Sequence, residues 1–528
     1  MSVLLELTED IAKQEQVLIQ GGGAAGQERQ RKLGRMPVRE RLVTLLDPDR
    51  PFLEMGLWAA WGMYREWGEV PAAGVVCGIG WVSGRACMVV ANDATVKAGA
   101  MFPQSIKKVL RAQKVAFQLR LPLVYLVDSA GVFLPLQDEI FPDEDDFGRI
   151  FRNNSVLSAA GIPQYSAVMG NCIAGGAYLP VLCDKILMTE GSQMCLAGPA
   201  LVKAAIGQIV DPEELGGARM HAEISGTADF HEKDDRSCLE RLRTLVGLLP
   251  ERTSSAAGKP PARDTGELYK LVPADGRGEY DVRDVMACLV DADSVEEYKP
   301  DYGRTVVTAY VRIDGRPAGI VANQRCRSHS AKGEIQIGGV LYPDSVEKAA
   351  RFVMDCNQTS VPLVFLQDVQ GFMVGKQAEQ SGIIRSGAKL VNAMSNAVVP
   401  KITVITGSSF GAGNYAMCGK AYDPAPIIAW PNARYAVMGG NQAADTLLTL
   451  RLRDAEKNGK KLSPEEIAEL RNTVRTQYDQ QTDIRYGAAR GWVDAIIAPT
   501  ETRKWLSSIL EIAPREKIAD YKTGVLQV

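Results

Sequence analysis

Two glycine-containing turns are the residues of this chain best placed to do chemistry. In IAGGAY, Gly175 and Gly176 follow a predicted strand and precede a predicted helix, and in FGAGNY, Ala412 and Gly413 stand at the same place 237 residues later. Backbone N–H groups at a helix N-terminus point outward with the positive end of the helix dipole behind them, so they can hold an oxyanion. One such turn alone is usually only a tight turn. Because the turn occurs twice, we predict two oxyanion sites.

A repeat that runs through most of the chain explains why the turn occurs twice. Residues 99–131 and 339–371 share glycine, proline, serine, lysine, arginine and aspartate at the same spacing, 240 residues apart. The runs PLVYLVDSAG and PLVFLQDVQG inside them are both apolar, and each has an acid and a glycine near its end. A period this long is not that of a solenoid and indicates two tandem domains of one fold. Two like domains suggest two like sites, one for each of two substrates.

The elements that position the turns alternate between strands and helices. This alternation, with strands rich in β-branched residues, predicts an α/β fold in both copies. The first copy is expected to have strands at 87–93, 123–129 and 165–170 with a helix at 105–119, and the second copy strands at 318–324, 363–369 and 402–407 with a helix at 345–356.

Polar and helical stretches suggest the domain bounds. We predict a helical lead-in over 1–29, a first domain over 30–250, a polar linker over 251–267 and a second domain over 268–528. Leucines at helical spacing end at DPDRP, which predicts a short helix there. The segment LSPEEIAELRNTVRTQYDQQ has a Ser-x-x-Glu capping box and predicts an exposed amphipathic helix that begins at Ser463.

Composition excludes several classes of partner. The formal net charge is −3, which offers no basic surface for nucleic acid or anionic membrane. No apolar stretch approaches the roughly 18 residues of a membrane span, and the N-terminus carries acids where a targeting peptide would carry basic residues, so we expect a cytoplasmic location. The ten cysteines form no CxxC pair, so no metal is expected. Only His221, His231 and His329 could supply the commonest general base.

Many ordered motifs resemble one enzyme family. VANDATVKAG, LVDSAG, FPDEDDFGRIF and IAGGAY in the first copy, and GFMVGKQAEQSGI, GNYAMCGKAY and WPNARYAVMGG in the second, are similar to the carboxyltransferase (β) subunits of biotin-dependent acyl-CoA carboxylases. Within that family the chain resembles the methylcrotonyl-CoA and geranyl-CoA carboxylases more than the propionyl-CoA or acetyl-CoA enzymes. The resemblance implies two tandem crotonase-like (ClpP/crotonase) domains.

The resemblance also implies a reaction. Family members are ligase-complex subunits that move a carboxyl group from carboxybiotin, carried on a separate protein, to an acyl-CoA. The cofactor then supplies the base, which agrees with the shortage of histidine. Gly175 and Gly176 would hold the thioester oxygen, and Ala412 and Gly413 the biotin oxygen. The expected substrate is 3-methylcrotonyl-CoA or a related branched enoyl-CoA, and no metal is expected.

The family also implies partners. The chain has no Met-Lys-Met segment that could accept biotin, so a biotin carboxylase/biotin carboxyl carrier (α) subunit is expected. A homo-oligomer, a hexamer by resemblance, is expected as well. Within the family we considered a decarboxylase subunit of the glutaconyl-CoA type, which would use the same sites. A non-catalytic scaffold fits the two retained turns less well. A simple enoyl-CoA hydratase is disfavoured because it needs paired acids in one domain and no duplication.

Further residues are candidates for substrate contact, each with a plainer structural reading. Lys97 could meet a CoA phosphate or be an ordinary surface lysine. The family usually reads DSGGANLPRQ where this chain reads DSAGVFLPLQ, so the acyl group could differ from methylcrotonyl. Asn441 replaces a usual glutamate in the second domain, and Asp128 and Asp368 are expected to be structural. The remaining candidates for substrate binding are Ala130, Gly131, Val132 and Phe133, together with Phe372 and Gly375 of the GFMVGK motif.

Overall fold

The computed structural model describes most of the chain and divides it into two compact units. We call them the amino-terminal unit (Ala12–Thr253 and Ala488–Gly491) and the carboxy-terminal unit (Met1–Ile11, Ser254–Gly487 and Trp492–Val528). The predicted linker contains the change of unit, and its residues 251–256 lie outside the described part, as does Asn441. The described residues are 2–249, 257–276, 278–330, 333–438, 445, 446, 448, 449, 452, 453, 457, 463–514 and 522.

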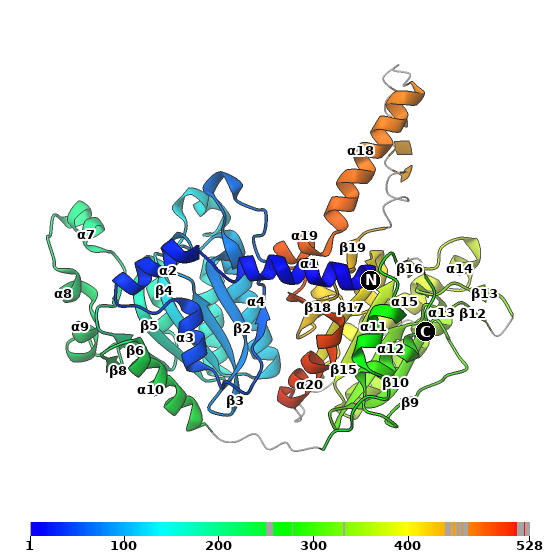
Figure 1. Ribbon diagram of the computed structural model, residues 1–528, viewed down its shortest axis with the longest axis horizontal. Helices are drawn as coiled ribbons and strands as arrows, with labels where there is room; N and C mark the ends of the chain where they lie inside the picture. The colour runs from blue at the N-terminus through cyan, green and yellow to red at the C-terminus, as the bar shows by residue number, and fades with distance from the viewer. Residues whose placement is uncertain are drawn as a thin grey trace. The chain divides into compact units, whose positions relative to one another are not determined.

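The amino-terminal unit is built on one mixed sheet (Figure 1). Its first three strands in the sheet order are antiparallel, and the strands from β3 onward run parallel. The order is β1 (Leu53–Met55), β2 (Val75–Val82), β3 (Arg85–Asn92), β4 (Leu123–Ser129), β5 (Gln164–Ile173), β6 (Lys185–Thr189) and β8 (Phe230–Glu232), with β7 (Gln193–Cys195) also paired to β5.

The carboxy-terminal unit repeats this topology strand for strand. Again an antiparallel start leads into parallel strands, and again one short strand joins the strand that precedes the second turn. The predictions of an α/β fold and of two like domains are therefore confirmed. The order is β9 (Glu296–Glu297), β10 (Val306–Ile313), β11 (Arg316–Asn323), β15 (Leu363–Val369), β17 (Lys401–Phe410), β18 (Ile427–Ala429) and β20 (Ala495–Ile496), with β19 (Arg434–Ala436) paired to β17; two small pairs are β12 (Ser328–His329) with β13 (Ile335–Gln336) and β14 (Val340–Leu341) with β16 (Gly371–Phe372).

The first long helix of each copy begins in the same way. α4 (Pro103–Leu119) and α13 (Pro343–Gln358) both have proline at the first helical position, where the missing N–H is not needed. Ser105 and Ser345 each accept a hydrogen bond from the backbone N–H three residues earlier. This is the physical reason why the proline and serine of the repeat recur at fixed spacing.

The other described α-helices belong to both units. They are α1 (Val3–Leu18), α2 (Gly23–Lys32), α3 (Val38–Leu45), α5 (Phe147–Ala159), α6 (Tyr178–Val181), α7 (Pro199–Ile206), α8 (Pro212–Gly216), α9 (Ala218–Glu223), α10 (Asp235–Gly247), α11 (Leu268–Leu271), α12 (Val282–Leu289), α14 (Lys376–Gln380), α15 (Ile383–Ser395), α16 (Gly411–Ala416), α18 (Pro464–Thr482), α19 (Ile484–Ala489) and α20 (Thr502–Ile512). None of the described helices is long and apolar enough to cross a membrane.

Each unit has its own hydrophobic core. In the amino-terminal unit, leucines of α3 and α10 pack on the sheet, and α3 ends before DPDRP as the leucine spacing predicts. In the carboxy-terminal unit, α13 and α15 pack on the sheet through Phe352, Val353, Leu390 and Met394, all fully buried. Burial of these side chains is the main stabilising contribution in each unit.

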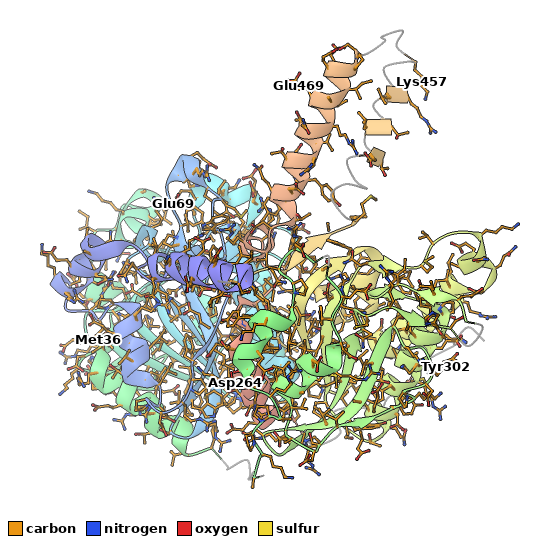
Figure 2. All side chains as sticks on the ribbon, turned by 45° about the vertical axis from the view of Figure 1, so that its right-hand side comes forward. Met36, Glu69, Asp264, Tyr302, Lys457 and Glu469 are labelled. Atoms are coloured by element: carbon orange, nitrogen blue, oxygen red, sulfur yellow. The ribbon has the colours of Figure 1, made fainter. Side chains whose placement is uncertain are left out.

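Helix α18 extends away from the sheet of the carboxy-terminal unit (Figure 1). Its predicted capping box is present, since Ser463 Oγ accepts from the backbone N–H of Glu466 at 3.2 Å and Glu466 Oε2 accepts from the N–H of Ser463 at 2.8 Å. Figure 2 shows the polar side chains that this helix carries, Glu469 among them. The prediction of an exposed helix is confirmed.

Candidate active site

Both predicted turns lie directly after the long parallel strand of their sheet. β5 leads into a short 3-10 helix (Ala174–Ala177) and then α6, while β17 leads straight into α16. The residue that begins each turn is left-handed, with φ 60° at Ala174 and 55° at Gly411, and the two residues are 237 positions apart. A left-handed conformation costs an alanine roughly 1 kcal/mol, so the backbone of the first turn is strained at Ala174.

The two glycines of the first turn have no structural reason to be glycine. Neither Gly175 nor Gly176 has a positive φ. Among the described residues, a Cβ added at Gly176 would meet nothing within 4 Å, and one added at Gly175 would meet only the ring of Phe147, at 3.4 Å. Alanine would therefore fit at both positions and would cost less conformational entropy. Small residues here are better explained by a ligand that must approach the backbone.

The second turn differs, because its glycines are needed for the fold. Gly411 is left-handed, and a Cβ at Gly413 would lie 2.6 Å from Val369 Cγ2 and 3.1 Å from Gly371 Cα. Between them, Ala412 takes the place that Gly175 has in the first turn. Packing alone thus accounts for glycine at 413, while the turn still presents N–H groups at a helix N-terminus.

A narrow apolar pocket opens beside Gly176. It has a volume of about 30 Å³ and lies where β3, β4 and β5 end, the edge at which open parallel sheets bind ligands. Apart from Asn92, Ser129 and Tyr125, its lining is hydrocarbon or sulfur. The lining residues are Val90, Asn92, Met101, Val109, Tyr125, Val127, Ser129, Phe147, Cys172, Ile173, Gly176 and Leu179.

The loop predicted to line the acyl pocket, residues 130–133, packs beside that pocket and does not line it. Phe133 stacks on Phe102 with ring centroids 4.2 Å apart and meets Trp67 edge-on at 5.4 Å. Val132 forms a parallel bridge with Met101, so this loop supports a pocket residue from behind. Among the described residues, those that line the pocket include Ser129 but none from Ala130 to Phe133. The loop's role in substrate choice stays a prediction.

Lys97 is engaged with the backbone of its own unit. Its Nζ donates a hydrogen bond to the carbonyl of Trp67 at 2.6 Å, and its φ of 46° is left-handed. The side chain is exposed, so a phosphate could compete with that carbonyl. Contact with CoA stays a prediction for Lys97.

The second turn borders a larger apolar pocket of about 340 Å³. Ala412 and Phe372 both line it, so the structure brings these two predicted residues together. Gly413 and Gly375 are not among the described lining residues; Gly375, with φ 108°, precedes α14. The lining consists of Phe372, Met373, Val374, Glu379, Ile383, Ile384, Gly387, Val391, Ala412, Tyr415 and Tyr422.

A buried acid lies near each turn and is paired with arginine. Asp128 accepts from Arg41 at 3.4 Å and from Arg35 at 3.5 Å, and Asp368 Oδ2 lies 3.3 Å from Arg325 Nε. Burial raises the pKa of both carboxyl groups, and the neighbouring arginines act in the opposite direction. Both acids are at most 2% exposed, so they are inaccessible to a substrate and hold structure, as expected.

Several lining residues were not predicted from the sequence. Met101, Phe147 and Cys172 line the first pocket, and Tyr415 lines the second. Tyr415 could have been predicted from the repeat, because Tyr178 stands at the same place in the first copy. Within the described residues, no group of three or more His, Cys, Asp or Glu side chains is arranged to hold a metal ion.

Comparison with known proteins gives a consistent result. The model of the carboxyl transferase domain matches residues 29–524. The chain is 44% identical over 513 residues to the biotin-dependent 3-methylcrotonyl-coenzyme A carboxylase beta1 subunit of Mycobacterium tuberculosis, covering 96% of this chain and 94% of the relative. It is 42% identical over 537 residues to the mitochondrial methylcrotonoyl-CoA carboxylase beta chain of Arabidopsis thaliana, covering 100% and 88%.

A solved structure is also similar over the whole length. The beta subunit of Pseudomonas aeruginosa geranyl-CoA carboxylase has a TM-score of 0.86 and 35% sequence identity, covering 99% of this chain and 96% of that one. This likeness, together with the family match, confirms the crotonase-like fold that the motifs implied.

Proposed function

Because this chain belongs to the carboxyl transferase family, as the β subunit of a biotin-dependent acyl-CoA carboxylase, we propose that it carboxylates 3-methylcrotonyl-CoA or a closely related branched enoyl-CoA. The observation that carries the proposal is the first turn. Gly175 and Gly176 are small without a structural need, and Gly176 borders an apolar pocket. That combination suits a thioester whose oxygen meets backbone N–H groups and whose acyl chain enters the pocket.

The chain's own contribution to the reaction is binding, orientation and charge stabilisation. As the acyl group loses a proton, negative charge develops on the thioester oxygen, and the N–H groups of Gly175 and Gly176 would stabilise it. Carboxybiotin, when bound, supplies the carboxyl group and the base. No histidine is among the residues that line either pocket in the described part of the chain.

The linings of the two pockets support an apolar acyl group on one side and a ring on the other. The pocket beside Gly176 is lined mainly by apolar side chains, which suits the hydrocarbon part of a branched acyl group. The 340 Å³ pocket is apolar and aromatic, which fits the fused ring of biotin, and Phe372, Ala412 and Tyr415 would hold it. The N–H groups of Ala412 and Gly413 would meet the ureido oxygen.

Exposed apolar side chains near both turns support the expected homo-oligomer. Tyr178 and Tyr415, at counterpart positions, are 49% and 51% exposed. Ile206 and Ile209 near α7, and Ile384 on α15, are each more than 70% exposed. Apolar surface of this kind commonly marks a protein interface, and a second copy of the chain is the occupant that a hexamer would supply.

The test is a carboxylation assay with the biotin-carrying α subunit co-purified. ATP, bicarbonate and a panel of acyl-CoAs are supplied, and product is measured by mass. We expect 3-methylcrotonyl-CoA to be carboxylated with a higher kcat/KM than acetyl-CoA, propionyl-CoA or geranyl-CoA. Faster turnover of geranyl-CoA would refute the substrate assignment, and a biotin-dependent release of CO₂ from a carboxyacyl-CoA in the absence of ATP would indicate the decarboxylase direction.

A further inference from the structure

His221 and Ser225 form a side-chain pair outside both pockets. His221 is on α9, and Ser225 follows the end of that helix, both in the amino-terminal unit. His221 Nδ1 lies 2.8 Å from the hydroxyl oxygen of Ser225, and His221 Nε2 lies 2.7 Å from the carbonyl oxygen of Met194. Neither side chain has a part in the proposed carboxyl transfer. A hydroxyl next to an oriented imidazole is the usual arrangement for activating a nucleophile.

The partners of the ring decide where its hydrogen is. The Met194 carbonyl can only accept a hydrogen bond, so Nε2 carries the hydrogen of the neutral ring. A neutral imidazole has only one N–H, so Nδ1 is left with a lone pair. The Ser225 hydroxyl therefore donates to Nδ1 at 2.8 Å, in preference to its other acceptor, the backbone carbonyl of His221, at 3.4 Å. This backbone carbonyl fixes the tautomer in which His221 can take the serine proton.

Thr227 completes the chain of hydrogen bonds. Its hydroxyl oxygen lies 2.8 Å from that of Ser225, and its backbone N–H donates to the same Ser225 oxygen at 3.4 Å. Because the Ser225 hydrogen points at His221, the Thr227 hydroxyl is the donor of this pair. Both groups would stabilise negative charge on Ser225 Oγ as its proton leaves.

The His221 ring is held in place by a buried backbone, while the Ser225 hydroxyl is exposed to solvent. Met194 is 2% exposed and belongs to β7, which is paired with β5, so the atom that orients His221 is part of the sheet. Ser225 itself is exposed. Because Ser225 is exposed, an acyl group could reach its Oγ from solvent.

We propose that Ser225 is a nucleophile toward activated acyl esters and thioesters, with His221 as its general base. Ser225 Oγ would form a bond to the acyl carbon while its proton passes to His221 Nδ1. The bond from that carbon to the leaving oxygen or sulfur then breaks, and the leaving group takes the proton from His221. The products are an acyl ester on Ser225 and a free alcohol or thiol. This reaction is separate from carboxyl transfer and needs neither biotin nor ATP.

The test uses the full chain and p-nitrophenyl acetate as the probe. After timed incubation the protein is digested, and acetylation is measured at Ser225 and at Ser395 in the same sample. Ser395 is the matched control, because it is exposed and its hydroxyl donates to the backbone carbonyl of Val391 at 2.6 Å. We expect acetylation of Ser225 to be about 10²-fold faster, the usual contribution of a positioned general base. Equal rates at the two serines would overturn the proposal.

Two variants test whether His221 acts as a base or only supports the local structure. In His221→Gln, the side-chain amide can still donate to the Met194 carbonyl but cannot take a proton, so acetylation of Ser225 should fall by about 10²-fold. In Ser225→Ala, the adduct on this peptide should be lost. An unchanged rate at Ser225 in His221→Gln would also overturn the proposal. The comparison within the wild-type protein needs no variant, so the test holds even where a variant fails to fold.

Discussion

Asp128 and Asp368 hold the same backbone position in the two units. Asp128 Oδ1 accepts a hydrogen bond from the N–H of Asn171 at 3.2 Å, and Asp368 Oδ1 accepts from the N–H of Ser408 at 2.8 Å. The pairing of β4 with β5 shifts register at Asp128, and the pairing of β15 with β17 shifts register at Asp368. In each unit the N–H that the carboxylate accepts from lies three residues before the turn begins. The acids therefore set where the long strand ends and the turn starts.

Removing this acceptor should cost stability. In Asp368→Ala, the N–H of Ser408, the hydroxyl of Tyr280 and the guanidinium of Arg325 lose their shared partner inside the core. We expect the free energy of unfolding to fall by about 3–5 kcal/mol, as for other broken buried pairs. Denaturant unfolding followed by tryptophan fluorescence measures it. The control is Asp301→Ala, whose carboxylate is exposed beside Arg304, and an equal loss there would contradict the structural role.

The two turns should respond differently to alanine. Gly176→Ala should leave the melting temperature unchanged, because its Cβ meets none of the residues that the structure describes, yet lower kcat/KM for acyl-CoA carboxylation by about 10²-fold by misplacing the thioester. Gly413→Ala should lower the melting temperature, because its Cβ would approach Val369 and Gly371 too closely. Gly148→Ala is the control, since that position is equally open on α5. Full activity of a folded Gly176→Ala variant would remove the first turn from the acyl site.

Met101 and Phe133 should separate substrate choice from stability. Met101 lines the narrow pocket, so Met101→Ala should enlarge it and shift the ratio of kcat/KM values toward bulkier acyl-CoAs by about tenfold. Phe133 stacks on Phe102 away from that pocket, so Phe133→Ala should lower thermal stability with little change in the ratio. Competition assays with two acyl-CoAs give the ratio directly. The reverse outcome would place the predicted loop in the pocket after all.

Glu15 should make the stability depend on pH. Burial raises its pKa from 4.5 to about 7, while Trp58 Nε1 donates to Glu15 Oε1 at 2.8 Å. Between these values the folded state keeps a proton that the unfolded state releases, so stability falls as the pH rises from about 4.5 to 7. Glu15→Gln keeps the acceptor without ionising and should be more stable than the wild type at pH 8 by about 1–3 kcal/mol. Unfolding at several pH values measures the difference; parallel curves for the two proteins would rule it out.

The repeated elements could be predicted from the sequence because their determinants are local. β4 and β15 have the predicted bounds, and α4 begins two residues before the predicted start, at the proline that fits its first turn. The capping box at Ser463 and the end of α3 follow from residues within one helical turn. Each of these signals involves neighbouring residues and needs no knowledge of the tertiary structure.

The details of the site depend on contacts between distant residues, which the sequence does not reveal. Phe133 meets Phe102 and Trp67 only because three separate segments of the chain converge, so its position in the sequence motif did not predict its packing. The need for glycine at 413 comes from Val369 and Gly371, which lie 44 and 42 residues earlier in the chain. The freedom at Gly176 comes from a lack of neighbours in the described structure. Similarity of motifs was enough to locate the two turns, but only the packing shows that Gly413 is needed for the fold and Gly176 is not.

The presence of a separate core in each unit has a calorimetric consequence. A ligand that binds only the folded form of one unit raises the unfolding temperature of the structure it contacts. Because the pocket beside Gly176 and the pocket beside Ala412 rest on different cores, an acyl-CoA and a biotin analogue should shift different parts of a heat-capacity trace. Scanning calorimetry with each ligand in turn would thus assign the two ligands to the two halves of the chain without any catalytic turnover.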